Sequence, residues 1–508
     1  MKNIVLIMTD TQRTDMLGCY KDTGLKTPCI DQLASQGMRF ERAYTTQPVC
    51  GPARSAIFSG QFPHSNGVFA NSLPYYDNVK TLGQRLSDNG FHTAYIGKWH
   101  LDGGDYFGMG RCPDGWDETY WYDMRRYLEE LPDFDRALSR NQKCMEHTNV
   151  AREFTYGNRC SNRAIDFLQK HSGKDFFLVV SYDEPHDPAI CPEPYASMYK
   201  DFVFPKPKNV YDTLENKPEH QKVWATTTPH YVADKSTLEI KNQYYFGCNS
   251  FIDSEIGRVM EAVDAYAPDA LVIYTSDHGF FLHSHSLSGK GPAAYDEITR
   301  IPFIIREPTE IKAGSVYEKP VSHVDLAPTI LDYAGLTIPK LLEGKNLRPV
   351  FCDTGIMVND TVFIEFGRFE IDHDGFGGFQ PMRAAFDGQY KLVINLLATD
   401  ELYDCAADPD EMVNLIDCDN TDIKEKRDAL HDKILSWMND TRDPFRGYYW
   451  ERRPWRVDAS EVTWRYNGMT RQREHEEYEP RELDYDTGLM MKAAVRGKVN
   501  PLAVNKHD

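Results

Sequence analysis

Five short segments of the chain are apolar without strict alternation, a pattern typical of strands that are buried on both faces of a parallel sheet. These segments span residues 3–8, 92–97, 176–182, 270–275 and 302–306. Apolar residues at helical spacing follow Thr27-Pro28, a cap with a first-turn proline, and recur between Leu238 and Tyr266. Strands that alternate with helices predict an α/β fold with a large, mostly parallel sheet sandwiched by helices.

The pattern changes beyond residue 344. Segments 361–366, 382–386 and 390–396 are typical of short antiparallel strands, and 422–438 of one amphipathic helix. We therefore predict three parts: a large α/β domain over residues 1–355, a smaller C-terminal α+β domain with a short antiparallel sheet over 356–445, and an irregular C-terminal extension over 446–508.

Composition excludes several classes of protein. The chain of 508 residues has 57 Lys and Arg against 77 Asp and Glu, a net charge of −20, which argues against nucleic acid as a partner. No stretch reaches the roughly 18 to 20 apolar residues of a membrane span, so we expect no membrane partner. The 11 cysteines lack the spacings of a disulfide framework or a zinc site. We expect a cytoplasmic protein.

Charged or titratable residues follow four of the predicted strands. Asp10 follows the first strand, Lys98 and His100 the second, His186 the third, and Asp277 and His278 the fourth. A single residue of this kind is commonly a cap or a structural side chain. Because the carboxyl ends of parallel strands share one edge of a sheet, where ligands bind, four such ends predict one functional site.

Cys50-Gly51-Pro52-Ala53-Arg54, followed by residues 55–60, is the most specific motif. A cysteine just before a proline at a helix start lies in a field that favours negative charge, and Arg54 can present its guanidinium to an anionic oxygen. The alternative is a small cysteine buried in a loop. The motif resembles the signature of type I sulfatases, in the alkaline phosphatase superfamily, whose CxPxR cysteine is oxidised to formylglycine.

The resemblance spans residues 1–440 and implies an alkaline phosphatase-like fold, with residues 1–355 as the catalytic sulfatase domain. Residues that match the family's catalytic positions are Cys50, Arg54, Lys98, His100, His186 and Lys290. Residues that match its metal site are Asp10, Cys50, Asp277 and His278. The resemblance also implies two partners, a small anionic sulfate ester as substrate and a formylglycine-generating maturation enzyme; a homo-oligomer is possible.

The metal is less closely defined. Many relatives have two adjacent acidic residues at the first strand end, whereas this chain has Asp10-Thr11, so that the Thr11 hydroxyl or the Gln12 carbonyl would substitute. Hard oxygen ligands favour Ca²⁺ or Mg²⁺, and the imidazole of His278 leaves Mn²⁺ open. The resemblance makes Ca²⁺ the first choice.

In the family chemistry, one hydroxyl of the aldehyde hydrate at residue 50 attacks sulfur, His186 donates a proton to the leaving oxygen, and His100 accepts one from the second hydroxyl. Aromatic residues beside carboxylates suit sugars, so we expect a small sulfated saccharide as substrate. Candidates for binding it are Asp102, Asp105, Tyr106, Trp116, Trp121, Arg125, Arg126, His285, His373 and Arg383, with core positions for both tryptophans as the alternative.

Two other functions stay open. A phosphonate or phosphate ester hydrolase of the same superfamily is favoured by Asp10 without an acidic neighbour and disfavoured by Lys98 with His100. A non-enzymatic binding protein on a decayed hydrolase scaffold gains slight support from the Arg- and aromatic-rich residues 446–508.

Overall fold

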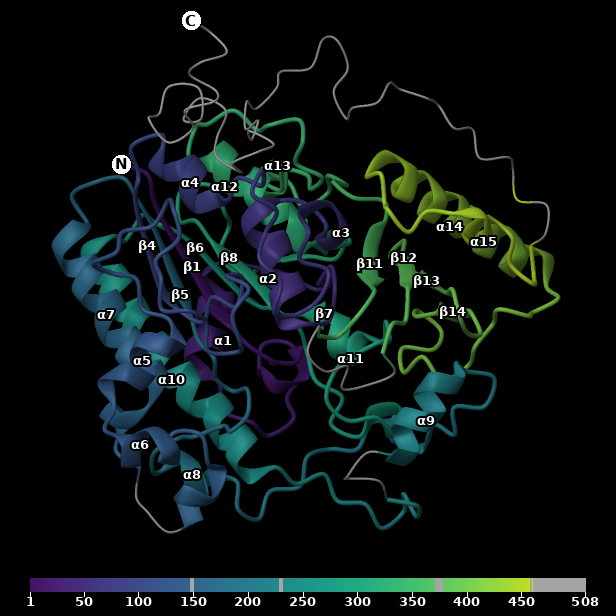
Figure 1. Ribbon diagram of the computed structural model, residues 1–508, viewed down its shortest axis with the longest axis horizontal. Coiled ribbons are helices and arrows are strands. Elements are labelled where there is room, and N and C mark those ends of the chain that lie inside the picture. The colour runs from purple at the N-terminus through teal and green to yellow at the C-terminus, as the bar shows by residue number, and fades with distance from the viewer. Residues whose placement is uncertain (147–149, 228–231, 371–377, 457–458, 460–508) are drawn as a thin grey trace, which may run out of the picture.

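The computed structural model describes residues 1–146, 150–227, 232–370, 378–456 and 459. A seven-stranded sheet with the order β4-β5-β1-β6-β8-β2-β9 forms the centre of the larger part, with helices on both faces (Figure 1). Its strands are β1 (Asn3–Thr9), β2 (Met38–Phe40), β4 (His92–Gly97), β5 (Phe176–Ser181), β6 (Leu271–Ser276), β8 (Phe303–Arg306) and β9 (Ser315–Tyr317). The predicted α/β fold with a mostly parallel sheet is confirmed.

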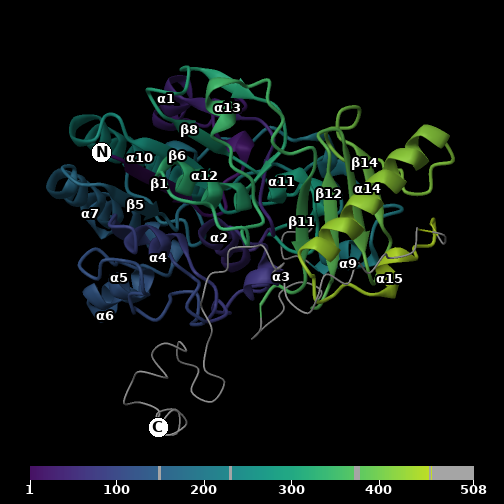
Figure 2. The same ribbon diagram turned by 90° about the horizontal axis from the view of Figure 1, so that it is seen from above.

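The alternation of side chains along β1 explains why two helical layers cover the sheet. Ile4 and Leu6 pack into one core cluster, and Val5 and Ile7 into another on the opposite face. The first cluster includes residues of α2 (Cys50–Ser59), α4 (Leu82–Ser87) and α12 (Leu326–Tyr333). The second includes residues of α1 (Pro28–Gln36), α7 (Tyr156–His171) and α10 (Gln243–Tyr266), the helices that Figures 1 and 2 show along that face.

Strands β4, β5, β1 and β6 are parallel, as predicted. The strand predicted at residues 302–306 exists as β8, but it runs antiparallel to β6, with Val272 opposite Arg306. The prediction of a parallel strand is therefore wrong at this position. An apolar run reports burial on both faces and carries no information on strand direction.

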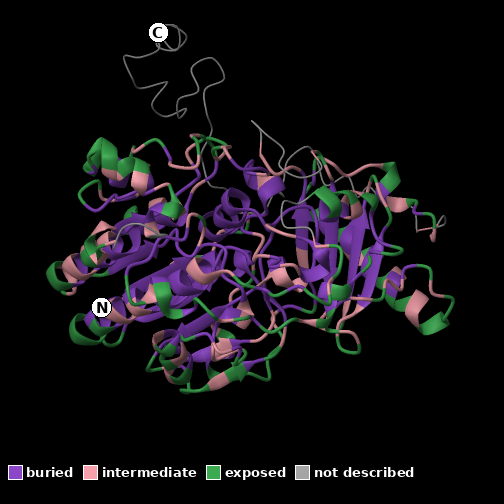
Figure 3. Cartoon of the chain, turned by 90° about the horizontal axis from the view of Figure 1, so that it is seen from below, coloured by how far each residue is buried: buried purple, intermediate pink, exposed green. Residues whose placement is uncertain are grey.

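The smaller part is an antiparallel sheet of β11 (Val362–Phe366), β12 (Met382–Phe386), β13 (Tyr390–Asn395) and β14 (Glu401–Asp404). Helix α14 (Thr421–Asp440) lies across it (Figure 2). Apolar residues of the helix and the sheet pack together, and the strands of this sheet are largely buried (Figure 3). This antiparallel sheet with one helix was predicted, although its fourth strand was not. After α14, Trp450 is buried and Arg453 pairs with Asp400 at 2.7 Å. The boundaries at residues 355 and 445 stay a prediction.

Short elements connect these layers. A three-stranded sheet contains β3 (Ala43–Tyr44), β7 (Arg300–Ile301) and β10 (Val321–Ser322). The remaining α-helices are α3 (Pro63–Asn66), α5 (Met124–Glu130), α6 (Asp133–Leu138), α8 (Tyr195–Met198), α9 (Glu219–Thr227), α11 (Asp296–Thr299), α13 (Pro349–Cys352) and α15 (Tyr448–Glu451). Among the described helices, none combines the length and apolar character that a membrane crossing requires.

Gly97 ends β4 in a conformation that brings Lys98 to the edge of the sheet. Its φ is +123°, and a Cβ atom built on it would lie 1.8 Å from the carbonyl oxygen of Ser181. The amide of Lys98 donates to that same carbonyl at 2.7 Å. Because the approach is between two backbones, no side-chain movement relieves the clash, and only glycine fits.

We predict that Gly97→Ala lowers the free energy of unfolding by about 3 kcal/mol or more, since steric overlap adds to backbone strain. Chemical denaturation measures the change. Gly173→Ala is the matched control, because a Cβ there meets nothing within 4 Å, and it should stay within about 0.5 kcal/mol of the parent. Equal stability of the two variants would contradict the assignment.

Candidate active site

The carboxyl ends of β1, β4, β5 and β6 and the first turn of α2 meet at one buried place. Asp10, Asp277 and His278 are fully buried there, and Cys50 is 1% exposed. Lys98 follows β4 and is equally buried. The topology therefore brings together residues that lie up to 268 positions apart in the chain, from Asp10 to His278.

Two lysines and a histidine surround the sulfur of Cys50. The Nζ atom of Lys290 lies 2.8 Å from Sγ and that of Lys98 3.9 Å, and Nε2 of His278 lies at 3.3 Å. Burial and the charge of Asp10 raise the pKa of the thiol, but Lys290, Lys98 and His278 outweigh them and hold it well below its usual range. This position therefore stabilises negative charge on the side chain of residue 50.

The guanidinium group of Arg54 donates hydrogen bonds to four groups of the protein itself. Its Nε donates to Asp277 at 3.0 Å and its Nη2 to Asp10 at 3.1 Å. Its Nη1 donates to the carbonyl of Lys98 at 2.8 Å and to Oγ of Ser181 at 2.6 Å. The expectation that this fork faces a substrate anion is wrong, because the fully buried side chain holds two carboxylates in place instead.

Asp10, Cys50, Asp277 and His278 place one ligand atom each within 4.8 Å of one another. Burial raises the pKa of Asp277 to about 6, and repulsion by the nearby Asp10 carboxylate adds to this shift, although Arg54 pairs with both carboxylates and Lys98 pairs with Asp10 at 2.8 Å. His278 directs Nδ1 to the carbonyl of Gly279 at 2.9 Å, which leaves its Nε2 lone pair facing the cluster. These groups fit a divalent cation.

Thr11 and Gln12 behave differently at the first strand end. The Thr11 hydroxyl donates to Oδ1 of Asp10 at 2.6 Å and so stays beside the cluster. The Gln12 amide is turned away, because its Nε2 donates to Asn249 at 2.7 Å and its Oε1 accepts from Thr9 at 3.0 Å and from Tyr274. The sequence left open whether the Thr11 hydroxyl or the Gln12 carbonyl replaces the second acidic ligand. The prediction for the Gln12 carbonyl is wrong, because this group bonds elsewhere.

A second set of contacts orients His186 beside Lys98. Asp183 accepts from Nζ of Lys98 at 3.0 Å and from the hydroxyl of Tyr106. Nδ1 of His186 lies 2.8 Å from the carbonyl of Asp187 and 3.2 Å from the Tyr106 hydroxyl. With Nδ1 as a donor to that carbonyl, Nε2 is the nitrogen left for chemistry.

His100 is 4% exposed and adopts a φ of +59°. Among the described residues, neither of its ring nitrogens has a hydrogen-bond partner. A buried imidazole without partners costs free energy, so a group that is not part of the folded chain is expected to satisfy it. Its backbone adjoins the site, since a Cβ on Gly51 would lie 3.3 Å from the His100 carbonyl.

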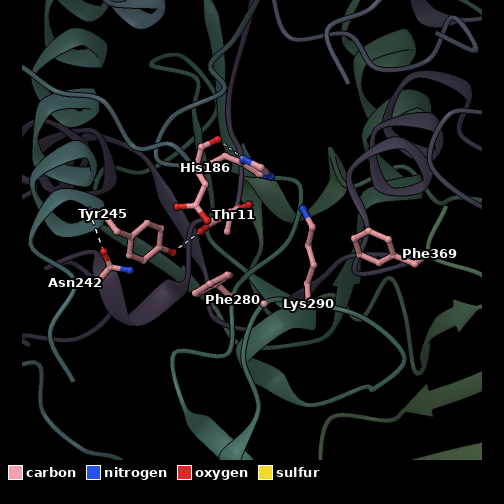
Figure 4. Close-up of a pocket in the computed structure, with 9 residues that line it drawn as sticks. Thr11, His186, Asn242, Tyr245, Phe280, Lys290 and Phe369 are labelled. Atoms are coloured by element: carbon pink, nitrogen blue, oxygen red, sulfur yellow. Dashed lines mark hydrogen bonds between the residues drawn. The ribbon is translucent and has the colours of Figure 1, made fainter. Parts of the chain in front are cut away.

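A cavity of about 120 Å³ leads to this cluster. Lys290 and His186 project into it, and the aromatic rings of Tyr245, Phe280 and Phe369 form much of its wall (Figure 4). The remaining lining residues are Thr11, Asp187, Asn242 and Gly289. A concave, mostly apolar pocket with a few convergent polar groups is the usual form of a small-molecule site.

Trp116 and Arg383 are not rim residues, and their prediction as substrate-binding groups is wrong. Trp116 is 8% exposed and packs in the core, with its ring centroid 5.2 Å from that of Tyr95. Trp121 is 2% exposed in the same cluster. Arg383 is 1% exposed on β12 and donates to both carboxylate oxygens of Asp443, at 2.6 and 3.0 Å.

His285 is also buried away from the cavity, contrary to its prediction as a substrate-binding group. Its Nδ1 lies 2.7 Å from Asp212, and its ring stacks on Tyr295 with 3.7 Å between centroids. Asp102 and Asp105 are not among the described residues that line the cavity; they bond within the loop around Tyr106 and to Arg125. His373 lies outside the described residues.

Some residues of the site were not predicted from the sequence. Asp183 directly follows Tyr182, so its place after a strand was an available signal. Asn71 accepts from the Gly51 amide at 2.8 Å, but it lies in a loop with no pattern to mark it. Asn242 caps α10 and is likewise a residue that only the fold brings to the cavity.

Comparisons with known proteins agree with this geometry. A family model for sulfatases matches residues 2–336, and a model for the C-terminal part of N-sulphoglucosamine sulphohydrolase matches residues 290–440. The chain is 45% identical over 496 residues to the "Uncharacterized sulfatase YidJ" of Escherichia coli (strain K12), covering 96% of each chain. The chain therefore belongs to the sulfatase family, within the alkaline phosphatase superfamily, and is a sulfatase, an enzyme that hydrolyses sulfate esters.

Two solved structures share the fold. One holds its substrate, D-glucosamine-2-N,6-O-disulfate; it has a TM-score of 0.69 and 23% identity, and covers 87% of this chain and 99% of that chain. The other is a phosphonate monoester hydrolase from Silicibacter pomeroyi, with a TM-score of 0.72 and 21% identity, covering 87% of this chain and 96% of that chain.

We predict that Asp277→Asn weakens the binding of a divalent cation at least about tenfold to hundredfold, because a buried anionic ligand is lost. Equilibrium dialysis with elemental analysis measures the bound metal. Asp269→Asn, in the exposed turn before the same strand, is the matched control and should retain the parent affinity. Undiminished metal in Asp277→Asn would overturn the assignment of this cluster.

Proposed function

We propose that the protein hydrolyses the sulfate monoester of a small saccharide, with Cys50 converted to formylglycine by a maturation enzyme. The observation that carries this proposal is the ring of Lys290, Lys98 and His278 around the side chain of residue 50. The two ammonium groups make the pocket favourable for an anionic substrate, although the whole chain carries a net charge of −20.

Asp10, Asp277, His278 and the side chain of residue 50 would hold a divalent cation, with Ca²⁺ first and Mg²⁺ or Mn²⁺ as alternatives. Such a cation supplies positive charge that polarises a bound oxygen and lowers the pKa of a hydroxyl beside it. The hydrate of formylglycine has two hydroxyls on one carbon. One would attack sulfur as the S–O bond to the alcohol breaks, and the other would lose its proton as the C–O bond to the sulfate breaks and the aldehyde re-forms.

Four further side chains of the site, together with Lys290, have separate roles in this proposal. Lys98 and Lys290 offset the repulsion between an attacking oxygen and the sulfate oxygens. His186, whose Nδ1 is held by the carbonyl of Asp187, presents Nε2 as the proton donor to the leaving oxygen. His100, with both ring nitrogens free among the described residues, would accept the proton of the second hydroxyl. Arg54 is a positioning residue, since its Nε, Nη1 and Nη2 atoms already donate to buried protein acceptors.

Two further proposals concern the cellular compartment and the substrate of the enzyme. All 11 cysteines are free thiols, which supports a reducing compartment and hence the cytoplasm. The saccharide substrate gains support from a structural relative whose substrate is D-glucosamine-2-N,6-O-disulfate.

A phosphonate or phosphate ester hydrolase is the second candidate. One structural relative is a phosphonate monoester hydrolase, and the first strand end carries Asp10-Thr11 without a second carboxylate. Lys98, which pairs with Asp10 at 2.8 Å and faces residue 50, favours the sulfate ester. Membership of the sulfatase family disfavours a non-enzymatic binding protein.

We predict that the matured enzyme turns over 4-nitrophenyl sulfate faster than phenyl phosphonate esters, and that Cys50→Ala abolishes both activities while the protein stays folded. Kinetic assays and circular dichroism measure these properties. Cys352→Ala, at an exposed cysteine, is the control and should keep the parent rate. Faster turnover of phosphonate esters would contradict the sulfatase proposal and support a phosphonate hydrolase. Activity in Cys50→Ala would exclude the formylglycine mechanism.

We also predict that His186→Ala lowers kcat about 10²- to 10⁴-fold on alkyl sulfates, because a poor leaving group needs a proton. The loss on 4-nitrophenyl sulfate should be at least about tenfold smaller, since its phenolate leaves without that help. The measurement is kcat of the parent and of His186→Ala on both substrates. Equal losses of kcat on both would contradict the assignment of His186 as the proton donor.

A further inference from the structure

The outer part of the cavity carries polar groups that the hydrolysis of a sulfate does not use. Asp187 is exposed and lines the cavity, and among the described residues no cation forms an ion pair with its carboxylate. Its backbone carbonyl is the one that holds Nδ1 of His186 at 2.8 Å. A carboxylate next to the proposed proton donor would repel the sulfate group of a substrate. We therefore expect this carboxylate to bind another part of the substrate.

Asn242 supplies a complementary group on the same wall. Its Oδ1 accepts from the amide of Tyr245 at 3.4 Å and so fixes the orientation of the side chain. No described group accepts a hydrogen bond from its Nδ2, and Figure 4 shows the side chain at the cavity beside Tyr245. The wall thus offers an acceptor in Asp187 and two N–H donors in Asn242.

Aromatic rings form another part of the cavity wall. The rings of Tyr245 and Phe280 lie 5.5 Å apart between centroids, and Phe369 faces the cavity from the other side of Lys290 (Figure 4). The hydroxyl of Tyr245 donates to the carbonyl of Thr11 at 2.5 Å, so its ring is held in place. A ligand that fills the cavity therefore meets the ammonium group of Lys290, the aromatic rings, and the acceptor and donor of Asp187 and Asn242.

We propose that Asp187 and Asn242 bind the hydroxyl groups of a sugar that carries one sulfate, and that the charge of Asp187 disfavours a second sulfate. The inference rests on the proposed function and adds which residues select the substrate. A neutral sugar ring provides hydroxyl donors for the carboxylate and hydroxyl oxygens for the amide. A quaternary ammonium sulfate would use the carboxylate and the rings but leave the Asn242 amide without a partner.

Steady-state kinetics on four kinds of sulfate ester tests this subsite. The probes are 4-nitrophenyl sulfate, methyl hexosides with one sulfate at a defined position, the same hexosides with two sulfates, and choline sulfate. For Asp187→Asn, we expect kcat/KM on the preferred monosulfated hexoside to fall at least about tenfold more than on 4-nitrophenyl sulfate, since a hydrogen bond to a charged group is lost.

The ratio of disulfated to monosulfated turnover should rise in Asp187→Asn at least about threefold, because the repulsion of a second anion is removed. Asp201→Asn removes one exposed carboxylate outside the cavity and is the control for net charge. Its ratio of kcat/KM on the monosulfated hexoside to that on 4-nitrophenyl sulfate, and its ratio of disulfated to monosulfated turnover, should match those of the parent. Asn242→Ala should lower kcat/KM on the monosulfated hexoside in the same direction as Asp187→Asn.

The outcomes separate this inference from the proposed function. An enzyme that hydrolyses none of the sulfate esters refutes the proposed function itself. Turnover of 4-nitrophenyl sulfate with ratios unchanged in Asp187→Asn refutes only the subsite. A wild-type preference for disulfated hexosides or for choline sulfate also contradicts the subsite, because it would show that the outer groups select a different charge.

Discussion

Two buried carboxylates, Asp10 and Asp277, form the constraint on which the rest of the site depends. Each lies at the end of a central strand, and the parallel register of β1 and β6 brings both to one point. Arg54 bonds to both, because α2 starts at the same edge of the sheet. Breaking a buried pair by removing one partner commonly costs about 3 to 5 kcal/mol, so this arrangement couples the stability of the fold to the geometry of the site.

The same arrangement explains why residue 50 can carry negative charge. Lys98 approaches it from the end of β4 and Lys290 from the long loop after β6, and both are buried next to Asp10. Their charges are therefore little screened by solvent and act strongly on the side chain of residue 50. The roles differ: Arg54 orients carboxylates inside the protein, whereas Lys290 and His186 reach the cavity where a substrate would lie.

The sequence predicted the parts of this molecule that depend on local pattern. Buried strands have apolar runs, so four of the five strands predicted for the large sheet were placed with the right direction, and the residues after these four lie together. The direction of β8 was not predictable, because burial looks the same in either direction. Trp116, His285 and Arg383 were misplaced for a related reason: residue type suggests binding, but only tertiary packing decides whether a side chain faces a cavity or a neighbour. Asp187 and Asn242 reach the cavity from separate loops, which no spacing rule connects.

The most direct test of the account is the relation between the chemical state of residue 50 and catalysis. Preparations made with different amounts of maturation enzyme can be analysed by mass spectrometry of the peptide that contains Cys50, which gives the fraction present as aldehyde. The account predicts that kcat on 4-nitrophenyl sulfate rises in proportion to that fraction and reaches zero when only thiol is present. Full activity in a preparation whose Cys50 is entirely unmodified would contradict it.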